Sequence, residues 1–106
     1  NAFGAGHYLT LLAKDNLAVA LAGLGRSNQA LTMHDEALAA MTDQLGTEHP
    51  YVLVVERNRM KTLQGFAPER IQTDTLEKLV LRHEDALGAD HPDTLEARAL
   101  QEKATP

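Results

Sequence analysis

A short segment containing glycine and histidine returns in this chain every 42 residues (45 − 3 = 42 and 87 − 45 = 42). The three copies are Phe3-Gly4-Ala5-Gly6-His7, Leu45-Gly46-Thr47-Glu48-His49-Pro50 and Leu87-Gly88-Ala89-Asp90-His91-Pro92. A period of this size is typical of stacked-repeat proteins, in which each unit buries its apolar side against its neighbours. Such an architecture favours a binding surface over a reaction centre.

Positions outside this segment match at the same interval. They are Leu11 with Leu53 and Leu95, Asn16 with Asn58, Leu21 with Leu63, Gly23 with Gly65, and Asp43 with Asp85. The pattern predicts one domain over residues 1–106, with repeats at 3–44 and 45–86 and a partial repeat at 87–106. Because the chain starts with Asn1 and stops at Pro106, before a second helix of the third repeat, we expect a segment of a longer protein.

The composition favours an all-α fold. Hydrophobic residues make up 43% of the chain, aromatic residues only 4%, and tryptophan is absent. A core of small and aliphatic side chains on helices fits these values. The chain has no cysteine, which excludes disulfides, thiolate metal sites and cysteine nucleophiles.

The charge narrows the range of partners. A formal net charge of −5, with scattered Lys and Arg residues, argues against a nucleic-acid module, which would show a basic face. No apolar run reaches the roughly 20 residues of a membrane helix, and no signal-peptide pattern is present. We therefore expect a soluble protein of the cytoplasm that contacts neither nucleic acid nor membrane.

Glycine and proline mark the expected helix ends. Gly46 and Gly88 suit helix C-termini, while Pro50 and Pro92 suit first helical positions. Ser27 is the candidate N-cap of another helix. The expected helices run over 8–23, 27–44, 50–64, 68–86 and 92–103. Apolar residues and histidines fall at helical spacing in the second and fourth of these, at Leu31, His34, Leu38, Met41 and Leu45, and at Leu76, Leu79, Val80, His83 and Leu87. In the first, Ala13, Ala18 and Ala22 should pack beside Leu11, Leu17 and Leu21.

The motif from Leu87 to Leu95, its counterpart at 45–50 and the stretches Asn16-Leu17-Ala18, Leu24-Gly25-Arg26 and Ala37-Leu38-Ala39 resemble the tetratricopeptide repeat. The long form of this repeat, the kinesin-light-chain type, occurs in bacterial signal-transduction ATPases and transcriptional regulators. The resemblance implies an alpha-alpha superhelix, a solenoid of antiparallel helix hairpins with about two and a half repeats. HEAT-type or armadillo repeats, of similar period, are the rival architecture.

The histidines invite a metal hypothesis, which the repeat geometry disfavours. Equivalent residues of stacked repeats lie roughly 10 Å apart, whereas metal ligands converge within about 2 Å of one ion. We therefore expect His7, His49 and His91 to cap or brace the loops, with Gly46, Pro50, Gly88 and Pro92 as further structural loop positions. For His34 and His83 a packed, hydrogen-bonded role is preferred. No metal and no cofactor is expected.

Catalytic motifs are not evident in the sequence. The acidic residues Asp35, Glu36, Glu48, Glu84 and Asp85 have no spacing that places them in a common cleft, and solvated helix surfaces explain them. The single serine, Ser27, lacks the Gly-x-Ser-x-Gly context, and no glycine-rich phosphate loop is present. The sequence therefore predicts a protein that is not an enzyme.

By resemblance, the first helix of each repeat lines a concave groove, where an asparagine meets the backbone of an extended peptide and basic residues meet its carboxylates. The residues at such positions here are Asn16, Asn58, Lys14, Arg57, Lys61 and Arg98. An amide suits this role because it donates and accepts hydrogen bonds at once. The alternative interpretation is structural, with the asparagines bonded to a neighbouring helix and the basic residues solvated.

A second functional hypothesis is assembly. Arrays of this type need about three repeats and polar ends for stability. The last first-helix would leave Leu95 and Leu100 partly uncovered, so we expect marginal stability, homo-oligomerisation, or packing on the rest of a parent protein. Light scattering that shows a stable monomer with a high unfolding midpoint would contradict this expectation.

Overall fold

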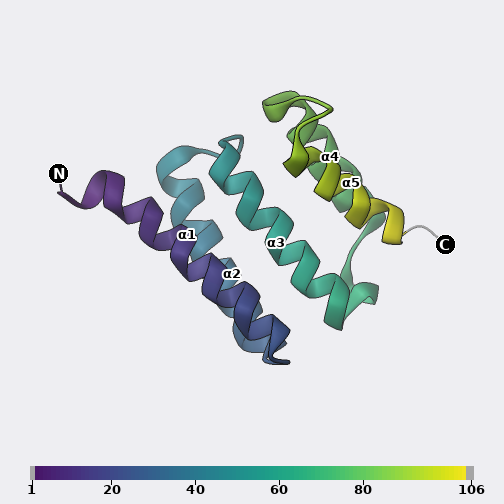
Figure 1. Cartoon of the computed structure of the whole chain (residues 1–106), viewed down its shortest axis with the longest axis horizontal. Helices are drawn as coiled ribbons and strands as arrows, with labels where there is room; N and C mark the ends of the chain where they lie inside the picture. The colour runs from purple at the N-terminus through teal and green to yellow at the C-terminus, as the bar shows by residue number, and fades with distance from the viewer. Residues whose placement is uncertain (1, 105–106) are drawn as a thin grey trace.

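Helices form almost all of the chain that the computed structural model describes, which is residues 2–104, with side chains from residue 8 to residue 104 (Figure 1). The elements are α1 (Ala2–Gly23), α2 (Ser27–Leu45), α3 (Pro50–Phe66), the short 3-10 helix η1 (Pro68–Arg70), α4 (Thr73–Leu87) and α5 (Pro92–Ala104). Residues 2–104 contain no strand. The expected all-α architecture of stacked helices is confirmed.

The helices lie in two layers. Figure 1 shows α1, α3 and α5 nearer the viewer, with α2 packed behind α1 and α4 packed behind α5. The molecule measures 48 × 33 × 19 Å, and its shortest dimension is close to two helix diameters of about 10 Å each. We call the surface of α1, α3 and α5 the front face, and the side that carries α2 and α4 the back face.

The second and third copies of the repeated motif form the loops that the sequence predicts. Gly46 and Gly88 follow α2 and α4 with φ values of 86° and 93°. These angles lie in the region that favours glycine, because a Cβ atom crowds the backbone there. Pro50 and Pro92 begin α3 and α5, where a missing N–H costs no helical hydrogen bond. Glycine and proline thus set the ends of four helices.

Replacing Gly88 with alanine should destabilise the protein by about 1–3 kcal/mol, because its φ of 93° and ψ of 155° lie in a region that is essentially restricted to glycine. No side chain lies within 4 Å of the position of a new Cβ, so the cost is one of backbone conformation. Urea unfolding followed by circular dichroism measures it. The control is Gly65→Ala within α3, which should be neutral or stabilising by about 0.5–1 kcal/mol. Equal effects of the two substitutions would contradict the explanation.

One expected helix start and one expected N-cap were wrong in the N-terminal half, whereas the expected start of the second helix at residue 27 is confirmed. The first helix begins at Ala2 rather than at residue 8, so the first copy of the motif is helical where the other copies turn. Tyr8 stands where Pro50 and Pro92 stand, and its backbone N–H lets the helical hydrogen bonds continue. Ser27 is the first residue of α2 rather than its N-cap. The N-cap is Arg26, whose side chain makes no capping bond.

The second helix of the second repeat starts later than predicted. The expectation was residue 68, but Pro68 opens η1 and α4 begins only at Thr73. In the first repeat, Ala30 and Leu31 anchor the first turns of α2 in the core. The equivalent residues are Gln72 and Thr73, which are polar and exposed, so no apolar contact holds the missing turn to the core.

The core consists of two apolar clusters. One contains Leu31, Met60, Leu63, Ala67, Leu76, Leu79 and Leu100, and the other Leu11, Ala37, Met41, Val52 and Val55. The predicted stripes of α2 and α4 therefore face inward. Leu17 was expected in the packing of the first helix, but it is 52% exposed, whereas Ala18 is buried. Leu95 is half exposed as expected, while Leu100 is buried against α3 rather than uncovered.

Candidate binding surface

The front face carries two hollows on either side of α3. Val19, Ala22 and Gly23 of α1 face Asn58 and Lys61 of α3 across the first, whose volume is about 240 Å³. The second, of about 200 Å³, lies between α3 and α5 and is lined by Arg57, Lys61, Glu96, Ala99, Leu100 and Lys103. Lys61 borders both hollows, so it stands at the middle of the surface.

Ion pairs connect the basic residues of α3 to the acidic residues of α5. Arg57 is buried, and its two terminal nitrogens lie 3.3 Å from Asp93 and 3.5 Å from Glu96. The Nζ atom of Lys61 lies 3.6 Å from Glu96, with both side chains at least half exposed. An exposed pair at this distance contributes little, about 0–1 kcal/mol. Replacing Glu96 by another carboxylate at Lys61 therefore costs little free energy, whereas the buried Arg57 is held by its two ion pairs with α5.

The two asparagines differ in their surroundings. Asn16 is exposed on α1, as the peptide hypothesis requires. Asn58 is half-buried, and its amide nitrogen donates a hydrogen bond of 2.7 Å to Oδ2 of Asp15. One function of Asn58 is therefore to join α3 to α1, which is the role that the structural interpretation gave it. Its position at the rim of the first hollow also leaves it next to any ligand there.

Lys14 and Arg98 point toward the second helices rather than into the two hollows. Lys14 forms an ion pair of 2.8 Å with Glu36 of α2. Arg98 pairs with Glu84 of α4 and donates to the carbonyl oxygen of Ala89. The structure thus brings Asn58, Arg57 and Lys61 together around the hollows and separates Lys14 and Arg98 from them.

A buried polar network joins α1, α2 and α3. His34 is fully buried; its Nδ1 lies 2.5 Å from Oδ1 of Asp15 and its Nε2 lies 2.9 Å from the hydroxyl of Thr62. Since Asp15 also accepts from Asn58, each of its oxygens has a partner. A buried carboxylate needs such partners because desolvation otherwise costs several kcal/mol, on the order of the stability of a small domain. The preferred interpretation of His34 as a packed, hydrogen-bonded residue is confirmed.

The loop histidines cap helices. Nδ1 of His49 accepts a hydrogen bond of 3.1 Å from the backbone N–H of Tyr51, and Nδ1 of His91 accepts one of 3.1 Å from Asp93. Each bond satisfies an N–H of the first helical turn that lacks a partner within the helix. The expectation of capping is confirmed for these two residues. The side chain of His7 lies outside the described residues.

His83 is the second buried histidine. Its Nδ1–H donates to the carbonyl oxygen of Leu79 at 2.8 Å, while its Nε2 is buried without a hydrogen-bond partner. Burial lowers the pKa of His83 below its usual value, although the bond to Leu79 opposes this shift. The positive charge of Arg57 lowers the pKa further, and Asp93 and Glu56 raise it. The folded protein therefore favours the neutral form.

Acidification should destabilise the fold through His83. Because the folded pKa is lower than the unfolded value near 6.5, the neutral histidine contributes stability above that pH. This contribution is lost as the pH falls below 6.5 and through the folded pKa. The check is the urea midpoint of unfolding, measured from pH 7.5 to pH 5 for the wild type and for His83→Met. Methionine is chosen because Met41 is buried at the same position of the first repeat. The variant should show a smaller decrease; parallel curves would contradict the prediction.

Two features are absent from the described part of the chain, a cluster of metal-binding side chains and a membrane-spanning helix. Within it, no group of three or more His, Asp or Glu side chains is placed to hold a metal ion. None of the helices traced between residues 2 and 104 is long and apolar enough to span a membrane.

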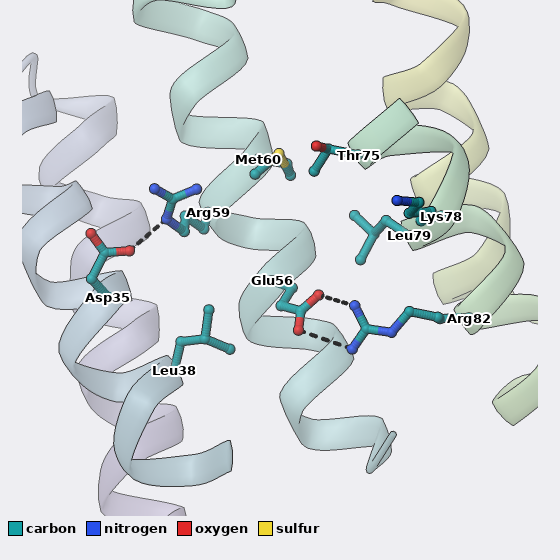
Figure 2. Close-up of a pocket in the computed structure, with 9 residues that line it drawn as sticks. All are labelled: Asp35, Leu38, Glu56, Arg59, Met60, Thr75, Lys78, Leu79 and Arg82. Atoms are coloured by element: carbon teal, nitrogen blue, oxygen red, sulfur yellow. Dashed lines mark hydrogen bonds and ion pairs between the residues drawn. The ribbon is translucent and has the colours of Figure 1, made fainter. Parts of the chain in front are cut away.

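Two features escaped the sequence reasoning. Asp15 lies between Lys14 and Asn16 and was not singled out, although a carboxylate on the apolar side of a predicted helix is a warning of a buried pair. The second feature is a larger hollow of about 350 Å³ on the back face, between α2, α3 and α4. Figure 2 shows that it is bordered by two ion pairs, Asp35 with Arg59 and Glu56 with Arg82.

Of three comparisons with known proteins, one gave a match. A search of curated proteins and a search of solved structures gave no significant match. Residues 10–51 match the family model of the tetratricopeptide repeat, and this segment comprises most of α1, all of α2 and the start of α3. The match supports a tetratricopeptide repeat protein.

Proposed function

We propose that this chain is a protein-binding module whose front face holds an extended peptide along α3. Tetratricopeptide repeats generally mediate protein–protein interactions, and residues 10–51 match that family. The observation that carries the proposal is the pair of hollows that meet at Lys61, each lined mainly by first helices. Clefts of this kind at helix boundaries are common places for a ligand.

The contacts suggest how the peptide would be recognised. Asn16 and Asn58 border the peptide path on α1 and α3 and offer amide groups to its backbone. Lys61 pairs with a carboxylate of the ligand after releasing Glu96. We give a smaller role to Lys14 and Arg98, because each is already paired with a glutamate of a second helix.

The period of 42 residues supports the long, kinesin-light-chain type of the repeat. On this basis we extend the proposal to a scaffold or sensor part of a bacterial signalling protein in the cytoplasm. The proposed module has no catalytic role, and its partner is a protein or peptide.

Selection from a displayed random-peptide library tests the proposal. The wild type should enrich a shared motif with at least one acidic residue, and Lys61→Glu should lose that enrichment. Asn16→Ala should weaken the selected peptide by about 0.5–1.5 kcal/mol, the usual net value of a hydrogen bond. Asn58→Ala is a poor test because it also removes the partner of buried Asp15.

The matched control is Lys78→Glu, which makes the same change on exposed α4 of the back face. Circular dichroism should show that all variants are folded. A motif that survives Lys61→Glu but not Lys78→Glu would move the site away from the front face. A wild type that enriches nothing would favour the structural and self-association alternative.

A further inference from the structure

The back hollow results from a difference between the two hairpins. α3 and α4 pack less closely than α1 and α2. In the first hairpin, Ala37 and Ala40 of α2 let the helices approach. The residues 42 positions later are Leu79 and Arg82, which are larger and line the hollow. Small side chains allow short interhelical distances, and large ones hold helices apart.

The floor of the hollow is apolar. Leu38 of α2, Met60 of α3 and Leu79 of α4 project into it from three sides (Figure 2). A second hollow of about 210 Å³ adjoins it beside η1 and shares Arg59, Met60 and Thr75 with it. Because the two hollows share these three lining residues, we consider them together and call them the back groove. Its larger part, of 350 Å³, is within the range of about 300–1,000 Å³ typical of ligand pockets.

The negative charges of the back groove are already neutralised. Asp35 lies 2.5 Å from Nε of Arg59. Glu56 receives two hydrogen bonds from Arg82, at 2.5 and 3.0 Å. Two further donors of Arg82 bond Glu48 and the carbonyl oxygen of Thr47. These bonds raise the pKa of the Arg82 guanidinium, with Glu56 as the main cause. Four of the five N–H donors of Arg82 are therefore already used within the protein.

The positive charges are not balanced in the same way. Lys78 is 73% exposed at the rim, and its ion pair is a 3.6 Å contact with Asp74 one turn earlier on the same helix. Exposed pairs of this spacing contribute only about 0.3–0.5 kcal/mol. Arg70 lines the 210 Å³ hollow beside η1. It is exposed and has no ion-pair partner within residues 8–104. The back groove thus has a local excess of positive charge in a chain whose net charge is −5.

We propose that the back groove binds an acidic peptide segment that inserts a large aliphatic or aromatic side chain over Met60. Its carboxylates meet Lys78 on one side and Arg70 on the other. The apolar floor provides affinity through burial, and the exposed cations Lys78 and Arg70 select for negative charge. This site lies on the face opposite to the peptide path of the proposed function and does not depend on it.

A set of three fluorescein-labelled peptides tests the site by fluorescence anisotropy. The first is fluorescein-Gly-Gly-Asp-Asp-Leu-Glu-Asp-Phe-amide. The second replaces its acids with Asn and Gln, and the third replaces Leu and Phe with Ala. Only the first should bind, more weakly at 0.5 M than at 0.05 M NaCl, because salt screens exposed charges. Equal binding of the first and second peptides would overturn the role of charge, and equal binding of the first and third would overturn the role of the apolar floor.

Variants locate the binding. The double variant Arg70→Glu with Lys78→Glu should weaken the first peptide by about tenfold or more, since two attractions become repulsions. Thr75→Trp should also weaken it by occupying the space between the two hollows. The matched control is Arg26→Glu in the exposed turn between α1 and α2, which should leave this peptide unaffected. Lys61→Glu tests the front face separately. Loss of binding in Lys61→Glu alone would assign the peptide to the front face and overturn the proposal.

The oligomeric state provides a further control. Light scattering from 5 to 500 µM should show a size that does not depend on Arg70 and Lys78. Concentration-dependent assembly that the double variant abolishes would identify a second copy of the chain as the occupant and would overturn the acidic-peptide assignment.

Discussion

Replacing Asp15 with alanine is expected to lower the free energy of unfolding by about 3–5 kcal/mol, the typical cost of removing one partner from a buried pair. Asp15 is fully buried and accepts from both His34 and Asn58. The substitution leaves Nδ1 of His34 and the Asn58 amide without their acceptor, and it opens a space between three helices. Urea unfolding followed by circular dichroism at pH 7.5 gives the value.

A double variant separates lost pairing from lost packing. This variant carries Asp15→Ala and His34→Leu. Both new residues already occur at the same positions of other repeats, Ala at 99 and Leu at 76, and Leu76 is only 1% exposed. We expect the double variant to recover part of the loss, because it no longer contains an unpaired His34 ring, whereas the Asn58 amide and the Thr62 hydroxyl still lack their former partners. The exposed carboxylate Asp74 serves as a control, and its replacement by alanine should change stability by less than about 0.5 kcal/mol. A double variant as unstable as Asp15→Ala would show that packing, not pairing, accounts for the effect.

Leu53→Ala is expected to destabilise the protein by about 2–5 kcal/mol, the range for deleting a fully buried leucine side chain. Leu53 has no exposed surface on α3, in the middle of the molecule. The lost stability has two parts, the transfer free energy of the deleted atoms and the cost of the cavity that remains. The cavity persists because the neighbouring helices relax only in part. The measurement is the shift of the urea midpoint at an unchanged m-value.

The matched substitution is Leu95→Ala, at the same repeat position in α5. Leu95 is 50% exposed, so removing the same atoms should cost less than about 1 kcal/mol. The ratio of the two losses of unfolding free energy measures how much burial by the neighbouring helices contributes to stability at one position of the repeat. Similar losses would indicate that Leu95 is covered in solution, as self-association of the chain would cause.

The fold was accessible from sequence because its markers are local. The positive φ of Gly46 and Gly88 and the N-terminal positions of Pro50 and Pro92 follow from restrictions on single residues. The inward stripe of α2, with Leu31, His34 and Met41 buried, follows from helical spacing. The late start of α4 was missed, since the contacts that would hold its first turn involve other helices.

The candidate site was only partly accessible. Repeat spacing placed Asn58, Arg57 and Lys61 on one helix, and the structure brings them to the front hollows. Repeat spacing did not show that Asn58 bonds Asp15, or that Lys14 and Arg98 pair with Glu36 and Glu84. These pairings depend on the rotation and spacing of neighbouring helices, which a single-helix pattern does not contain.

The amino-acid sequence by itself determined the period, the helices and their turns, because backbone sterics and helical periodicity act within a few residues. The tertiary structure alone decided which polar residues are buried and where the surface is hollow. Asp15 and Asn16 are neighbours in the chain, yet one is in the core and the other in solvent. The back hollow exists because Leu79 and Arg82 replace the alanines of α2 at a helix contact. Burial and cavity shape are properties of several helices together, so they arise only when the helices pack.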